Sequence, residues 1–153
     1  MSGLWKIDRT DMVQALFPLE GPHTAESVVA ASMAVAELWR YLAHATRYSI
    51  AGALTDPADV SVIVANFTVG MRSADQVLGQ LSYWAQRLIE NPALADDRDR
   101  ADVARAVAAT GEIASWLVEA RDDMSMVVRD LGEVSADLGH LCLGRVVGQE
   151  QRS

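Results

Sequence analysis

Apolar residues recur at alternating steps of three and four positions from Val103 to Leu141. These steps place every member on one stripe of a single α-helix. At 1.5 Å per residue, a helix of this length is roughly 60 Å long. It needs apolar partners along its whole length, within its own chain or in another. The stripe comprises Val103, Ala106, Thr110, Ile113, Leu117, Ala120, Met124, Val127, Leu131, Val134, Leu138 and Leu141.

A stripe with the same period predicts a preceding helix that is roughly 45 Å long. Asp56 suits its N-cap, Pro57 suits its first helical position, and Asn91-Pro92 ends it. The β-branched run from Val60 to Val64 is also compatible with a strand, but it stays in register with the stripe and favours a helix. The stripe comprises Val60, Val64, Phe67, Met71, Ala74, Leu78, Leu81, Ala85 and Leu88.

The first long helix is predicted to begin after Thr24, which suits an N-cap, with Glu26 in the first turn. Its stripe comprises Val28, Ala31, Val35, Leu38, Leu42, Ala45 and Ser49. The residues before Gly21-Pro22 form an arm, with a short helix that ends at Phe17 before Pro18. This arm is too apolar for a free tail, so we expect it to dock.

Together these elements predict an all-α protein: an antiparallel up-down-up bundle of three long helices with a short N-terminal helical arm. The predicted organisation is an arm at 1–22, a bundle at 23–145 and a frayed tail at 146–153. The third long helix would extend about 15 Å beyond the second, at the end where the first two long helices join. Either it breaks near Gly132, or a second chain covers the excess.

A line of small residues beside the main stripe of the third long helix favours the second chain. Glycine inside a helix costs roughly 1 kcal/mol relative to alanine, so glycines aligned on one side call for close approach of another helix. A symmetric homodimer buries such a line most economically. The predicted partner interface comprises Gly111, Val118, Ser125, Val128, Gly132, Ser135 and Gly139.

Composition and charge exclude several classes of partner. The formal net charge of −8 argues against nucleic acid and against anionic lipid surfaces. The uncharged stretch from Val60 to Met71 is too short to cross a bilayer as a helix. Cys142 is the only cysteine, which excludes an intramolecular disulfide and favours the cytoplasm. We expect this thiol to be buried or interfacial.

One group of residues has the spacing of a metal site. Asp137 and His140 form a D-x-x-H pair, with Glu133 one turn earlier on the same face. A di-iron bundle needs a second matching motif, and the nearest one, Glu37-x-x-Arg40, ends in an arginine. The trio also points away from the apolar stripe. We therefore expect a solvated face, no metal and no cofactor.

The first long helix carries a polar strip of Glu37, Arg40, His44 and Arg47, bordered by Tyr41 and Tyr48. The simpler interpretation is a solvated face with ion pairs at i,i+3. The alternative is a basic, aromatic-edged groove for an acidic partner or ligand. The overlapping segment from Leu38 to Arg47 resembles a stretch in small uncharacterised actinobacterial helical proteins. That resemblance implies no activity.

No catalytic motif is present, so the sequence favours a non-enzymatic helical module for interaction or assembly. We expect a homodimer, with a further protein partner as an option. The first alternative is a bundle that binds or senses a small molecule, in a cavity lined by Trp39, Tyr41, Phe67, Met71 and Trp84. The second alternative is a metal-dependent enzyme, which depends on Glu133, Asp137 and His140 alone.

Overall fold

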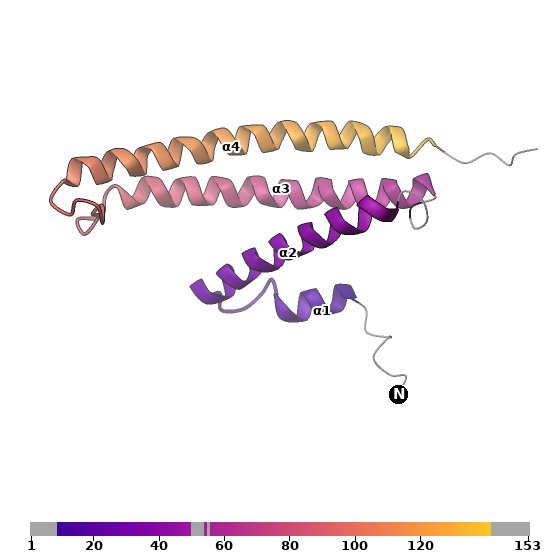
Figure 1. Ribbon diagram of the computed structural model, residues 1–153, viewed down its shortest axis with the longest axis horizontal. Helices are drawn as coiled ribbons and strands as arrows, with labels where there is room; N and C mark the ends of the chain where they lie inside the picture. Colours follow the sequence, from indigo (N-terminus) through magenta and orange to yellow (C-terminus); the bar gives the residue numbers. More distant parts are fainter. Residues whose placement is uncertain (1–8, 50–53, 55, 142–153) are drawn as a thin grey trace, which may run out of the picture. The chain divides into compact units, whose positions relative to one another are not determined.

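The computed structural model describes residues 9–49, 54 and 56–141, and their regular structure is entirely helical. Four helices are present in this part of the chain: α1 (Arg9–Leu16), α2 (Ala25–Ser49), α3 (Pro57–Leu88) and α4 (Val103–Leu138) (Figure 1). The chain divides into two compact units, Met1–Ala53 and Leu54–Ser153. The predicted all-α class, with a short N-terminal helix and three long helices, is confirmed. The division falls inside the predicted 23–145 bundle, and the predicted tail lies outside the described residues.

In the first unit, α2 begins with a reciprocal capping box. The backbone N–H of Ser27 donates to Oγ1 of Thr24 at 3.1 Å, and the backbone N–H of Thr24 donates to Oγ of Ser27 at 3.0 Å. Two of the N–H groups that a helix start leaves unpaired are thus satisfied. Thr24 is the predicted N-cap, and the structure confirms it.

In the second unit, both helices also begin at aspartate caps. Asp56 accepts a hydrogen bond from the N–H of Ala58 at 2.9 Å, and Pro57 occupies the first helical position, as predicted. Asp102 accepts from the N–H of Arg105 at 2.9 Å and so caps α4. The helix begins after the other aspartates of the preceding loop, because Asp102 occupies the N-cap.

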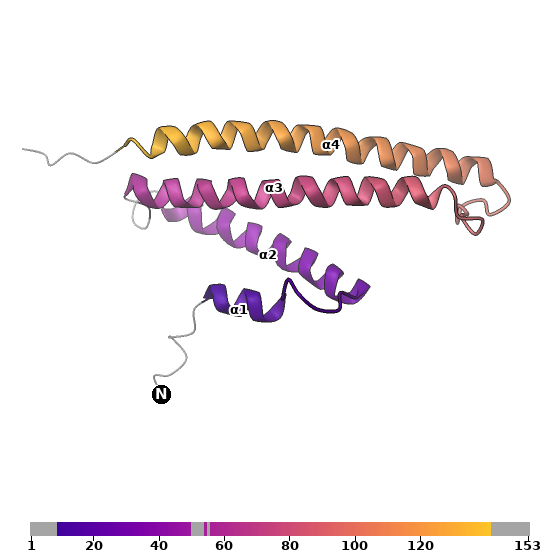
Figure 2. The same ribbon diagram turned by 180° about the vertical axis from the view of Figure 1, so that it is seen from behind.

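Helices α3 and α4 lie side by side and antiparallel, as both views show (Figures 1 and 2). Their register is fixed by two polar contacts. Ser82 Oγ donates to the backbone carbonyl oxygen of Ala114 at 3.2 Å, and Arg121 Nε lies 3.3 Å from Oδ1 of Asp75. We call this pair of helices the hairpin.

The predicted overhang of the third long helix is wrong. Helix α4 has 36 residues and α3 has 32, so α4 is longer by only about 6 Å. Extending the register from Ser82 and Ala114 places Leu138 level with the first turns of α3. The excess therefore lies at the loop between α3 and α4, at the opposite end from the prediction. Helix α4 also runs through Gly132 without a break.

The hairpin contains little fully buried apolar surface. Among the described residues, the buried apolar side chains are Ala85, Ala106 and Ala114, and no large side chain is fully buried. Larger residues between the helices, such as Leu78 and Leu117, are only half-buried. Two helices in contact leave the sides of their shared seam open to solvent. The hairpin is thus built like half of a larger bundle.

Candidate interaction surface

Helices α3 and α4 meet along a line of residues that we call the seam. Some seam positions coincide with the predicted stripes, and others are displaced from them by one residue. On α3 the seam alternates by three and four residues through Val64, Thr68, Met71, Asp75, Leu78, Ser82 and Ala85. On α4 it runs through Val107, Thr110, Ala114, Leu117, Arg121, Met124, Val128, Leu131, Ser135 and Leu138. Somewhat less than half of each predicted stripe lies in this seam. Of the members beside it, Leu81, Ile113, Val127 and Val134 are exposed, whereas Val60, Phe67, Ala74 and Leu88 are half-buried and Ala106 is buried.

The stripe members that flank the seam lie on the same side of the hairpin on both helices. Leu81 comes directly before the seam residue Ser82, and Ile113 comes directly before the seam residue Ala114. In an antiparallel pair of helices, equivalent positions that flank the seam meet on the same side. Leu81 and Ile113 flank the seam, and Trp84 and Trp116, three residues later, lie further from it. Together, positions of these two kinds therefore form one continuous surface across both helices.

We call this surface the apolar face and define it by its exposed large residues. They are Val77, Leu81 and Trp84 of α3 with Ile113, Trp116, Val127 and Val134 of α4. Trp84 and Trp116 occupy equivalent outer positions and retain 59% and 67% of their accessible surface. A row of exposed acids, Asp123, Asp130 and Asp137, continues the outer edge on α4.

The opposite side of the hairpin holds most of the predicted partner interface. Gly111, Val118, Ser125, Gly132 and Gly139 share this side, and we call them the small-residue stripe. The other two predicted interface residues, Val128 and Ser135, lie half-buried in the seam. A methyl group added at Gly111 or Gly132 would meet nothing within 4 Å. The stripe's role as an interface stays a prediction.

A polar network crosses the hairpin next to this stripe. Asp75 is partly buried, and its Oδ1 accepts a hydrogen bond from Oγ of Ser125 at 3.0 Å besides its ion pair with Arg121. The Arg121 side chain extends over Gly79, where an added Cβ would lie 3.5 Å from Nε. Buried or half-buried polar pairs of this kind favour one register over its neighbours.

The loop between the helices is held by a second carboxylate, Asp96, whose side chain is nearly buried. Arg98 donates to it from Nε at 2.9 Å, from a terminal nitrogen at 2.7 Å and from the backbone N–H at 3.0 Å. These hydrogen bonds, and the positive charges of Arg98 and Arg105, hold the pKa of the Asp96 carboxyl well below its usual range. Sequence reasoning missed this clamp, because Asp96 stands among three other aspartates in the loop.

In the polar strip on α2, one pair of residues forms the i,i+3 ion pair that the simpler interpretation predicts. Arg40 and Glu37 form an ion pair at i,i+3, and both side chains are largely exposed. Tyr41 is also exposed, and so are His44 and Arg47. Ion pairing within one helix accounts for the spacing of Glu37 and Arg40. The basic groove for an acidic partner stays a prediction.

The residues of the predicted small-molecule cavity are distributed over two helices. Trp39 and Tyr41 lie on α2, and Phe67, Met71 and Trp84 lie on α3. Met71 is a seam residue. Phe67 and Trp84 are 17 residues apart on one helix, which separates them by about 25 Å along its axis. A compact ligand that contacts Phe67 would therefore not contact Trp84.

The potential metal ligands of the sequence form no metal site in the part of the chain that the structure describes. Groups of three or more His, Cys, Asp or Glu side chains that could hold a metal ion are absent there. Glu133, Asp137 and His140 are all exposed at the end of α4. Cys142 lies outside the described residues.

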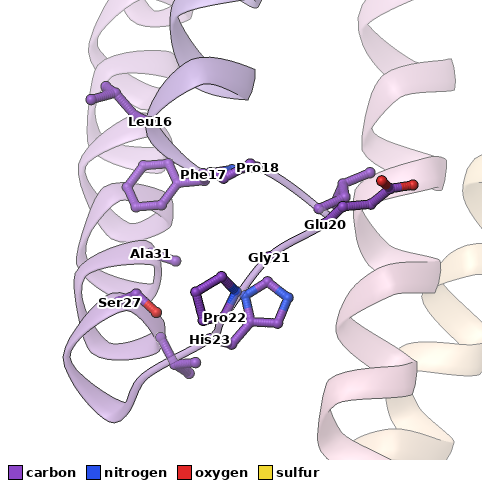
Figure 3. A pocket seen from close by; sticks show the side chains of 11 residues that line it. Leu16, Phe17, Pro18, Glu20, Gly21, Pro22, His23, Ser27 and Ala31 are labelled. Atoms are coloured by element: carbon purple, nitrogen blue, oxygen red, sulfur yellow. The ribbon is translucent and has the colours of Figure 1, made fainter.

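One apolar pocket is present in the first unit (Figure 3). It has a volume of about 340 Å³ and lies between the turn after α1 and the first turns of α2. The turn contributes Phe17, Pro22 and His23 to its lining, and α2 contributes Ser27 and Ala31. Phe17 is half-buried beside α2, whereas Leu16 and Leu19 are exposed, so docking of the arm as a whole stays a prediction.

Comparisons with family models, with curated proteins and with solved structures found no match to this chain. Within the described residues, no helix combines the length and the apolar character needed to cross a membrane.

Proposed function

We propose that this chain is a non-enzymatic helical assembly module that acts as a homodimer through an exposed surface of the hairpin. The observation that carries the proposal is the apolar face, where seven large apolar side chains remain exposed on one side of two adjacent helices. Contiguous apolar surface of this extent is rare on monomeric proteins and marks interaction sites.

The chemistry of the face supports protein rather than lipid or nucleic acid as its partner. Its apolar centre is bordered by the acids Asp123, Asp130 and Asp137, and the whole chain carries a net charge of −8. Phosphate-bearing surfaces would be repelled by this charge. Another helical surface supplies apolar side chains at matching spacing, and it leaves the acids at the rim in water.

The two alternatives lack an observation of this kind. Within the described residues, the side chains of the small-molecule alternative are distributed along separate elements, and Glu133, Asp137 and His140 of the metal-enzyme alternative are exposed. We rank both below the assembly module.

Sedimentation equilibrium of the full chain tests the proposal. We expect a mass of twice 16.6 kDa, with a monomer appearing only on dilution. Because burial of apolar surface drives the association, the dissociation constant should not increase with added salt. A mass of 16.6 kDa at every concentration would contradict the proposal.

A further inference from the structure

We infer that the apolar face is covered by the apolar face of a second copy of this chain, with a two-fold axis that runs parallel to the helices. Each α3 then packs on the α4 of the other copy, and the two hairpins form a four-helix bundle. This inference rests on the proposed function and adds to it the surface, the partner and the geometry.

The size of the face fits a second hairpin. Between Ile113 and Val134 of α4 the face is about 32 Å long and roughly 18 Å wide, which gives about 570 Å². Two such faces bury roughly 1,100 Å² in all, above the total of about 1,000 Å² that a specific interface needs. A single helix covers a strip only about 10 Å wide and would leave the outer positions of Trp84 and Trp116 in solvent. A second hairpin matches both the width and the length.

The tryptophans select the direction of the axis, and the charges are compatible with it. Asp123, Asp130 and Asp137 form the outer edge of the face on α4, whereas the equivalent edge of α3 carries Val77 and Trp84. An axis perpendicular to the helices would place α4 on α4 in opposite directions, with the two acidic rows at opposite ends of the dimer, and Trp84 would not meet Trp116. An axis parallel to the helices places the two α4 helices diagonally, so each acidic row faces an uncharged edge.

The same axis pairs the exposed tryptophans. Trp84 follows Ser82 by two residues and Trp116 follows Ala114 by two residues, and Ser82 and Ala114 are in contact. The two tryptophans thus lie within about one turn of the same level, at opposite edges of the face. The two-fold rotation places Trp84 of one copy against Trp116 of the second copy. Paired aromatic rings contribute more to the free energy of association than the burial of their apolar area alone.

Cross-linking between singly labelled copies tests the geometry. In a Cys142→Ser background, one chain carries Val77→Cys and the other carries Asp123→Cys, and the two are co-expressed and treated with a short bis-maleimide. Val77 follows Asp75 by two residues and Asp123 follows Arg121 by two residues, so both lie near the level of the Asp75–Arg121 ion pair. We expect a cross-linked heterodimer as the main product. We expect no cross-link between two Val77→Cys chains, whose substituted positions lie on diagonally opposite helices.

A matched control uses Gln76→Cys in place of Val77→Cys, because Gln76 is the neighbouring residue on the other side of α3. It should cross-link to Asp123→Cys at least tenfold less. Efficient cross-linking of Asp123→Cys to itself would overturn the inference in favour of the perpendicular axis. A dimer in which neither Val77→Cys nor Asp123→Cys cross-links would overturn the apolar face as the interface and leave the proposed function standing. A monomer in sedimentation equilibrium would overturn both.

Discussion

Asp96 stabilises the loop between α3 and α4 in its charged form. Three hydrogen bonds from Arg98 and the ion pair with Arg105, at 3.3 Å, stabilise the carboxylate and not the carboxylic acid. Because the pKa of the folded state is lowered, this contribution is fully present above the unfolded pKa of about 3.9. It is lost as the pH falls below that value towards the folded pKa.

Replacement of Asp96 by asparagine should therefore lower Tm at neutral pH. The difference in Tm between wild type and Asp96→Asn should stay constant from about pH 7 to pH 5 and narrow below about pH 4. Thermal unfolding followed by circular dichroism across this range measures it. Asp97→Asn is the matched control, since Asp97 is the exposed neighbour and should change Tm little. A difference in Tm between wild type and Asp96→Asn that does not change with pH would contradict the stabilising role of the charged Asp96 carboxylate.

The glycines of α4 distinguish two hypotheses about the dimer interface, which is either the apolar face or the small-residue stripe. A Cβ at Gly132 meets nothing within 4 Å in the hairpin, so Gly132→Ala should raise the free energy of unfolding by up to about 1 kcal/mol through helix propensity alone. If the apolar face is the interface, the dimer mass should not change. Urea unfolding combined with light scattering gives both quantities. A weakened dimer would instead favour the small-residue stripe.

The helices themselves were predictable from local signals. Thr24, Asp56 and Pro57 mark starts that depend on only a few neighbouring residues, and the alternating steps of three and four fixed the periods. The side of each helix that meets its neighbour was not predictable in the same way. On α4 two adjacent lines are both apolar or small, and the register that selects between them comes from Asp75 and Ser82. Both residues are polar and were omitted from the predicted stripes.

For the whole molecule, the structure gives a different reason to expect a dimer than the sequence did. The sequence favoured a dimer because of an overhang on the third long helix and a line of small residues beside its apolar stripe. The register of Ser82 with Ala114 removes that overhang. The incomplete burial of the hairpin replaces the overhang as the reason for a partner, since large apolar side chains remain exposed on the same side of both helices. Exposure of this kind depends on the packing of two distant segments and is not encoded in either period alone.

If the apolar face holds the dimer together, a charge placed on this face should dissociate it, whereas the same charge on the small-residue stripe should not. Val127 on the apolar face and Val118 on the small-residue stripe are the same residue type on one helix, with 44% and 41% of their surface exposed. Sedimentation equilibrium should show that Val127→Glu raises the dissociation constant about a hundredfold or more, because two buried valines are lost and two carboxylates enter the interface. Val118→Glu should leave it within about threefold of wild type. Dissociation by Val118→Glu with an intact Val127→Glu dimer would contradict the claim.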